Sequence, residues 1–176
     1  KDNKILSEEK IVASLPTINY LIKHNAKVII MSHLGKIKMQ EDREKNSLFI
    51  VYQKLCELFN VKVIFSSSTR GSILEEKISS LNYGEVLLME NTRFEDLNDK
   101  AESNCNEELS KYWASLGDVF INDAFAVSHR KHASNYGISK YLPTAIGFLI
   151  EKEIKGLDLV INPERPFTVV MGGAKV

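Results

Sequence analysis

The chain has 176 residues, 44% hydrophobic and 26% charged, and its 23 Lys and Arg residues balance its 23 Asp and Glu residues. A chain this apolar buries enough surface to offset the entropy lost on folding, which excludes disorder as its main state. Dedicated nucleic-acid-binding proteins carry a basic excess, which is absent here, and no apolar run approaches the ~18 residues of a membrane-spanning helix. The length predicts about one domain.

A helical pattern that ends in Asn or Gly and leads into a short apolar run occurs four times. The first pair is a helix over 7–24, which Pro16 is expected to kink or split, and a strand over 26–32. Asn and Gly tolerate the left-handed conformation that closes a helix, and nearly continuous apolar runs are typical of parallel strands buried on both faces. The other pairs are predicted at 47–59 and 61–65, 72–81 and 85–90, and 104–116 and 118–122.

This alternation predicts an α/β domain with a doubly wound, mainly parallel sheet and helices on both faces, a three-layer, Rossmann-like arrangement. The intervening segments carry weaker signals. The polar stretch 96–107 is most simply a solvated loop, and 66–69 is a polar turn. Residues 145–160 are predicted to form one helix, and 167–171 a strand that leads into a tight turn at 172–173.

The cysteines and the chain ends bear on the context of the protein. Cys56 and Cys105 are not spaced as metal ligands, so we expect two reduced thiols in a soluble protein of a reducing compartment, the cytoplasm. No signal peptide precedes the first helix. The chain starts at Lys1 without a Met and stops at Val176 after a Gly-rich turn, so both ends look cut.

Basic residues follow three of the predicted strands. His33 and Lys36 come after the first, Arg93 after the third, and His129, Arg130 and His132 lie in the loop after the fourth. Open parallel sheets bind ligands at the carboxyl ends of their strands, where such loops emerge. Concentrated positive charge at one edge of a neutral chain favours a small, multiply anionic ligand, a phosphate or a carboxylate.

Each of these residues also has a purely structural explanation. A single His such as His33 is more often a turn or cap residue than a ligand contact. Arg93 could form a weak surface salt bridge with Glu90 or Glu95, and Arg130 could lie in a solvated charged loop. Likewise, the polar pair at 122–123 could cap the following turn. The joint placement at three strand ends favours function over each separate explanation.

Several local motifs are missing. The sequence contains no Gly-x-x-x-x-Gly-Lys-Ser/Thr loop, no Gly-x-Gly-x-x-Gly after a strand, no nucleophile elbow and no His-Glu-x-x-His. No local pattern therefore supports a zinc site or a covalent mechanism, and an unrelated dinucleotide-binding fold is only a weak alternative. The one Gly-rich turn with a lysine is 172–175.

Five blocks of sequence, taken together, resemble the phosphoglycerate kinase family in order and spacing. The similarity covers nearly the whole chain, and it includes Pro16, which belongs to the first block. The blocks are Ser14-Leu-Pro-Thr-Ile18, Ser32-His-Leu-Gly-Lys36, Leu88-Met-Glu-Asn-Thr-Arg-Phe-Glu95, Val119-Phe-Ile-Asn-Asp-Ala-Phe125 with Ser128-His-Arg-Lys-His-Ala-Ser134, and Arg165-Pro-Phe167 with Met171-Gly-Gly-Ala-Lys-Val176.

The resemblance implies a two-domain kinase that moves a phosphoryl group between 1,3-bisphosphoglycerate and ADP, giving 3-phosphoglycerate and ATP. It assigns 1–143 to an N-terminal phosphoglycerate-binding domain without its first strand, 144–162 to an interdomain helix, and 163–176 to the first strand and turn of a C-terminal nucleotide domain. That domain would bind Mg-ATP or Mg-ADP and is mostly absent. The resemblance implies a monomer when full length, with no metal site, nucleic acid or membrane involved on this side.

By the resemblance, His33, Arg93 and Arg130 contact the glycerate phosphate, and Lys175, with Gly173, lies on the nucleotide side near the transferring group. Lys10 and Lys36 also belong to the site, Lys10 in a catalytic role, but the family has arginine at both positions. Residues 126–128 are Ala-Val-Ser where the family has Gly-Thr-Ala. Lysine keeps the positive charge but lacks the planar guanidinium of arginine, which can donate to two oxygens at once. The alternative is therefore a catalytically impaired relative that binds a phosphate ligand.

Overall fold

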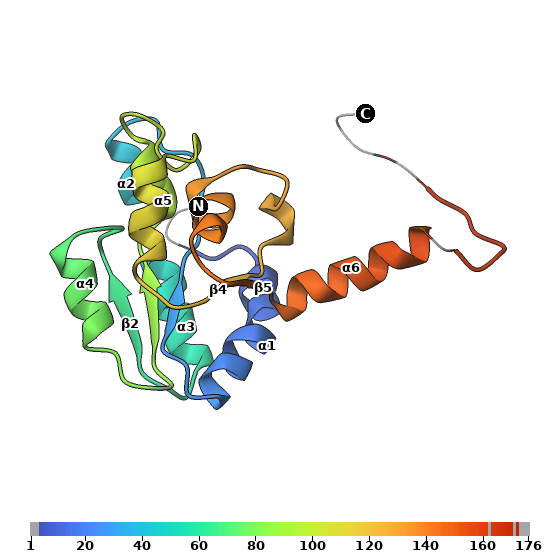
Figure 1. The fold of residues 1–176 in the computed structure, drawn as a ribbon, viewed down its shortest axis with the longest axis horizontal. Helices are drawn as coiled ribbons and strands as arrows, with labels where there is room; N and C mark the ends of the chain where they lie inside the picture. Colours follow the sequence, from blue (N-terminus) through green and yellow to red (C-terminus); the bar gives the residue numbers. More distant parts are fainter. Residues whose placement is uncertain (1–3, 162, 171, 173–176) are drawn as a thin grey trace.

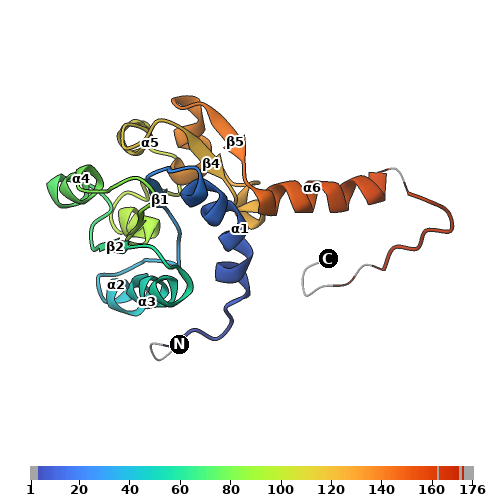
Figure 2. The same cartoon turned by 90° about the horizontal axis from the view of Figure 1, so that it is seen from below.

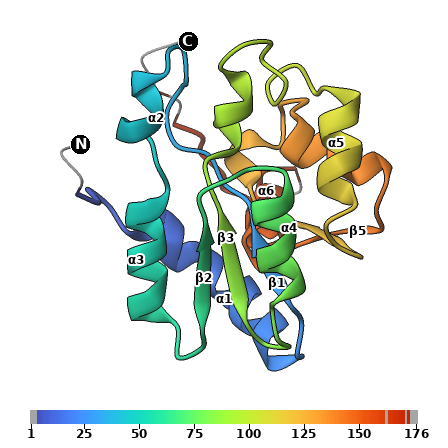
Figure 3. The same cartoon turned by 90° about the vertical axis from the view of Figure 1, so that its left-hand side faces the viewer.

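Three parallel strands form the main sheet of the computed structural model, which describes residues 4–161, 163–170 and 172. These are β1 (Val28–Ile30), β2 (Val63–Ser66) and β3 (Val86–Met89), in the order β1-β3-β2. Val86 of the central strand is in register with Val28 on one side and Val63 on the other. Figure 3 shows the three strands side by side.

Helices cover both faces of this sheet. Seen along the strands in Figure 2, α4 and α5 lie on one side, and α1 and α3 on the other. Four short helical turns lie in the connections: η1 (Thr92–Asp96), η2 (Phe125–Val127), the π-helical turn η3 (Ala133–Gly137) and η4 (Ile138–Lys140). The helices are α1 (Glu9–Lys23), α2 (Glu41–Lys45), α3 (Phe49–Leu58), α4 (Ser72–Ser79), α5 (Glu107–Ala114) and α6 (Phe148–Ile161).

The core lies on the two faces of β3, whose residues are all fully buried. Alternate residues of a strand point to opposite faces, so Val86 and Leu88 pack with α1 and α3 while Leu87 and Met89 pack with α4 and α5. The near-continuous apolar run predicted this two-sided burial. The α/β class with helices on both faces is thereby confirmed.

A second sheet was only half predicted. Strand β4 (Phe120–Asn122) pairs in parallel with β5 (Thr144–Ile146), which follows a long connection through η2, η3 and η4. The expected helix over 145–160 therefore begins later, at Phe148. Pairing with β4 satisfies the backbone of 144–146, and neither periodicity nor propensity in so short a segment indicates such a partner.

Three further expectations differ from the structure. Helix α1 runs unbroken through Pro16, so the expected split does not occur, and the burial of Ile18 and Leu15 against the sheet helps to offset the lost backbone hydrogen bond. The stretch 96–107 is not a solvated loop, since Ala101 and its neighbour Glu102 are buried. No strand forms over 167–170, which pairs with no described segment; residues 171 and 173, and so the tight turn, lie outside the described residues.

Helix α6, which projects from the rest of the molecule in Figure 1, is capped from another strand end. Asp123 Oδ1 accepts hydrogen bonds from the backbone N–H of Leu149 (2.9 Å) and Ile150 (3.2 Å). Its Oδ2 accepts from the Thr17 hydroxyl (2.6 Å), which in turn accepts from the backbone N–H of Phe148 (2.9 Å). One carboxylate thus fixes the start of α6 to β4 and α1.

This cap predicts that Gly147→Ala destabilises the protein. A Cβ at Gly147 would collide with the Cγ and Oδ1 of Asp123 and push the carboxylate off the helix end. We expect a loss of about 1–3 kcal/mol in the free energy of unfolding, measured by urea denaturation. The matched control is Gly156→Ala on the same helix, where nothing lies within 4 Å of the added Cβ and about 0.5–1 kcal/mol should be gained. Equal stability of the two variants would contradict the capping role.

Candidate active site

The candidate site lies at the carboxyl edge of the strands, where three loops meet the start of α1. His33 and Lys36 are on the loop after β1, and Arg93 is on η1, directly after β3. A backbone hydrogen bond from Thr92 to Ser32 (3.0 Å) ties the ends of β1 and β3 together. The loop after β4 then brings in the basic residues His129, Arg130 and His132.

His33 is the residue around which the charges gather. Although it reaches the surface, the protein around its ring displaces water, and this desolvation is the largest cause of a lowered pKa. The positive charges of Arg93, His132, Arg130 and Lys10 lower the pKa of His33 further. The structure therefore brings two arginines, a lysine and a second imidazole, from three other segments, within electrostatic range of this imidazole.

Arg93 is the most constrained member of the cluster. Its side chain is 10% exposed, and its Nη1 donates to Asp96 Oδ2 (3.1 Å) and to the Ser103 hydroxyl (3.0 Å). Among the described residues, the buried Arg93 Nε has no hydrogen-bond partner. A buried guanidinium N–H without an acceptor is rare, and this one is covered by the surrounding protein.

The expected surface salt bridges of Arg93 do not form. Glu90 is buried and its carboxylate accepts from the backbone N–H of Leu48 (2.7 Å) and from the Ser47 hydroxyl (2.6 Å), so it fixes the start of α3. Glu95 instead pairs with Arg70. The acidic partner of Arg93 is thus Asp96, one helical turn further along, which spacing alone could not distinguish from the other two.

The loop after β4 adds charge that is less shielded. Arg130 is exposed, and its Nε lies 3.4 Å from His129 Nε2. Burial lowers the pKa of His132, and the charges of Arg93, Arg130 and His129 lower it further, while Asp96 opposes them. His132 therefore shares two arginines with His33, and both rings remain largely neutral until the pH falls below their ordinary range.

The remaining predicted residues divide into two groups. Lys10 lies exposed in the first turn of α1, within electrostatic range of His33. Lys36 is exposed on the His33 loop and forms no ion pair with the described residues. Gly173 and Lys175 lie outside the described residues.

Asn91 links two of the loops and was not singled out from the sequence. It is fully buried, and its Nδ2 donates to the carbonyls of Leu34 (2.7 Å) and Asn46 (2.9 Å). Its Oδ1 accepts from the backbone N–H of Arg93 (3.0 Å). One amide thereby holds the His33 loop against η1. The available signal was a polar residue directly after a wholly buried strand.

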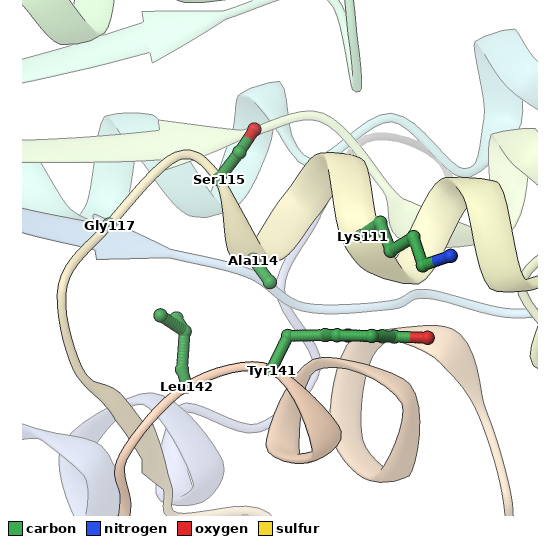
Figure 4. Close-up of a pocket in the computed structure, with 6 residues that line it drawn as sticks. All are labelled: Lys111, Ala114, Ser115, Gly117, Tyr141 and Leu142. Atoms are coloured by element: carbon green, nitrogen blue, oxygen red, sulfur yellow. The ribbon is translucent and has the colours of Figure 1, made fainter.

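Two hollows in the structure lie away from the candidate site. A cavity of about 360 Å³ between α5 and the turn after η4 is lined by Lys111, Ala114, Ser115, Gly117, Tyr141 and Leu142 (Figure 4). A second, of about 240 Å³, lies between α1 and α6. Neither contains a strand-end cation.

The described ranges contain neither a metal-ligand cluster nor a membrane-spanning helix. No three His, Cys, Asp or Glu side chains gather there in a way that could hold a metal ion. None of the helices there combines the length and apolar character needed to cross a bilayer. Both cysteines in these ranges are unpaired, with Cys56 exposed and Cys105 half-buried.

Comparisons with known proteins agree with the geometry. The family model described as phosphoglycerate kinase matches residues 1–176. Curated phosphoglycerate kinases of Fusobacterium nucleatum and Macrococcus caseolyticus are 54% and 55% identical across the whole chain, which covers 45% of each relative. The chain thus spans less than half the length of these relatives.

Solved structures give the same result. The crystal structure of phosphoglycerate kinase from Pyrococcus horikoshii matches all of this chain and 44% of its own, with a TM-score of 0.85 and 37% identity. The structure of phosphoglycerate kinase from Coxiella burnetii matches 94% of this chain and 40% of its own, with a TM-score of 0.77 and 33% identity.

The lowered pKa values of His33 and His132 predict that stability depends on pH with a definite sign. Between the ordinary value of 6.5 and the lowered values, the unfolded chain binds protons that the folded chain does not. The free energy of unfolding should therefore fall as the pH drops through this window. Urea denaturation at a series of pH values measures the slope.

Replacing both rings in a His33→Gln, His132→Gln variant should flatten that slope. His24→Gln serves as the matched control, because His24 lies at the far end of α1 from the cluster. An unchanged slope in the double variant would show that these imidazoles are not held among like charges.

Proposed function

Because the chain belongs to the phosphoglycerate kinase family, we propose that the full-length protein transfers a phosphoryl group between 1,3-bisphosphoglycerate and ADP, giving 3-phosphoglycerate and ATP. In this proposal residues 1–143 bind the phosphoglycerate, 144–162 link two domains, and 163–176 enter the nucleotide domain. The relatives are more than twice as long as the chain, which leaves room for that domain.

The observation that carries the proposal is the convergence of cationic groups on His33. Like charges held together repel one another, and here burial adds the cost of removing water. A phosphate group with about two negative charges offsets both costs at once. The exposed Arg130 supplies a planar guanidinium that can donate to two phosphate oxygens, and Arg93 adds positive charge to the same cluster.

The chemistry asked of these residues is modest. Phosphoryl transfer needs positioning and charge neutralisation, with little covalent work by the protein. The cluster therefore holds the distal phosphate and orients the carboxyl end of the glycerate toward the nucleotide. Lys10, on the first turn of α1, adds a point charge that can follow the transferring group. Closure of two domains around the substrates would exclude water that otherwise hydrolyses an acyl phosphate.

The nucleotide side belongs to the rest of the protein in this proposal. We propose that Mg-ATP and Mg-ADP bind to the C-terminal domain, with Gly173 and Lys175 as contacts. The unpaired thiols fit a cytoplasmic location, and we propose that the full-length protein is a monomer.

Arg130→Ala in the full-length protein tests this function. Losing a charge-assisted hydrogen bond worth about 1.5–3 kcal/mol should raise the KM for 3-phosphoglycerate about 10- to 150-fold. The KM for ATP should stay unchanged, because Arg130 lies on the phosphoglycerate side. A coupled assay of ADP formation measures both constants.

The matched control is Lys111→Ala, which removes an exposed cation on α5 that pairs with Glu107. It should leave both constants unchanged. Equal KM values for 3-phosphoglycerate in the two variants would rule out the cationic cluster as the phosphate site.

A catalytically impaired relative is the second candidate, and Lys10 is the feature that favours it. Lysine stands there in place of the family's arginine, and the structure leaves it exposed, without a fixed partner in the described ranges. The same assay distinguishes the two. Normal turnover of the unaltered protein excludes the impaired relative, whereas binding without turnover, restored by Lys10→Arg, would support it.

A further inference from the structure

The segment between η1 and α5 contains a buried carboxylate that the proposed mechanism does not use. Glu102 is 1% exposed, although the surrounding sequence is polar. Burial raises the pKa of Glu102, and its hydrogen bonds to Ser134 oppose the rise. Since burying a carboxyl group is costly, its partners indicate what the group does there.

Glu102 holds the far end of the loop that carries Arg130. Its Oε2 accepts from the backbone N–H of Ser134 (3.0 Å), and its Oε1 accepts from the Ser134 hydroxyl. Its backbone carbonyl accepts from the N–H of Ala133 (2.9 Å), and its Oε1 lies 3.7 Å from His132 Nδ1. The backbone and the side chain of one residue therefore bind Ala133 and Ser134, next to the ring of His132.

The next residue, Ser103, contacts the other half of the cluster. Its hydroxyl accepts from Arg93 Nη1 (3.0 Å) and donates to Asp96 Oδ2 (2.5 Å). Its backbone N–H donates to Asp96 Oδ1 (2.8 Å). Two adjacent residues thus connect the turn that bears Arg93 with the loop that bears Arg130.

The loop that carries Arg130 is held together by its own hydrogen bonds, so it moves as one unit with the residues that Glu102 binds. Asn135 Oδ1 accepts from the N–H of His132 (3.2 Å), and its Nδ2 donates to the carbonyl of Val127 (2.9 Å). The N–H of Arg130 donates to that same carbonyl (2.9 Å). These bonds join the two ends of the loop, Val127 and His132, on either side of residues 128–131. Glu102 fixes these joined ends next to η1.

We propose that Glu102 is a positioning residue that sets the loop of Arg130 and His132 against Arg93, so that all three face one anion. The assignment rests on the proposed function for its substrate, but its structural basis is independent of it. Without the carboxylate, both arginines remain charged and present, but the distance between them is no longer fixed. A loss of positioning then weakens phosphate binding without touching the nucleotide side.

The test uses the full-length protein with Glu102→Ala, Glu102→Gln and Glu85→Ala. Glutamine keeps the length, its carbonyl can accept from the Ser134 N–H, and its NH₂ can donate to the Ser134 hydroxyl oxygen. It therefore retains the geometry and removes only the charge. Glu85 is the matched control: its side chain is 15% exposed and binds Asn82, at the opposite end of β3.

The coupled assay with 3-phosphoglycerate and ATP gives the expected split. Glu102→Ala should raise the KM for 3-phosphoglycerate about tenfold or more at unchanged KM for ATP, and Glu102→Gln should recover most of the loss. Glu85→Ala should leave both KM values unchanged. A Glu102→Ala variant that loses only kcat, or that shifts both KM values equally, would overturn the positioning role, because a purely structural role predicts just that.

Should Glu102→Ala not fold, Ser134→Ala, which removes one of the two side-chain hydrogen bonds, must raise the KM for 3-phosphoglycerate in the same way.

Amide hydrogen exchange of the full-length protein without ligand gives a second, independent readout. Glu102→Ala should speed exchange at Ser134 and along 128–131, while Glu85→Ala should not. Unchanged exchange would overturn the proposal even if the unaltered protein showed no kinase activity. That last result alone would count against the proposed function and leave the exchange result to decide the role of Glu102.

Discussion

Repulsion among like charges is the constraint on which the rest of this structure depends. Cationic groups from α1, η1 and the loop after β4 lie near enough to His33 to lower its pKa, and Asp96 is the carboxylate that opposes them at His132. These neighbours disfavour the charged form of the His33 ring, and a dianion bound among them would remove that penalty.

Buried polar side chains supply this rigidity at the carboxyl edge of the sheet. Asn91 holds the His33 loop to η1, and Glu90 fixes the start of α3 beside it. On the other side, Asp123 fixes the start of α6 to β4. Each of these groups is satisfied by backbone partners, so it stabilises one arrangement of loops and is costly to disturb. The exposed cations Lys10, Lys36 and Arg130 lie on the outer side of this framework, where an anion can reach them.

The sequence predicted the elements that depend on apolar periodicity. The helix and strand rhythm gave α1, α3, α4 and α5 with β1 to β4 in chain order, and it placed the basic residues at strand ends. It failed where burial depends on distant partners. The local sequence predicts that Glu102 is solvated, because its partner Ser134 is distant in the chain. It also predicts that part of β5 is helical, because the pairing with β4 leaves no local signal. Polar contacts between residues far apart in the chain leave no local pattern.

The roles of individual site residues divide in the same way. Position after a strand was enough to predict that His33 and Arg93 share an edge, because parallel strands end together. It could not predict that Arg93 is buried on Asp96 with a free Nε, since Glu90 and Glu95 were equally plausible partners. Nor could it show that Asp123 caps a helix that starts 25 residues later, because that contact depends on how β4 and β5 pair.

The most direct test of the central claim is an NMR titration of the His33 imidazole in the full-length protein, with and without 3-phosphoglycerate. The account predicts a pKa below 6.5 in the free protein, because burial and neighbouring cations disfavour the charged ring, and a clear rise when the dianion binds. A ring that titrates at or above its ordinary value, or that ignores the ligand, would contradict it.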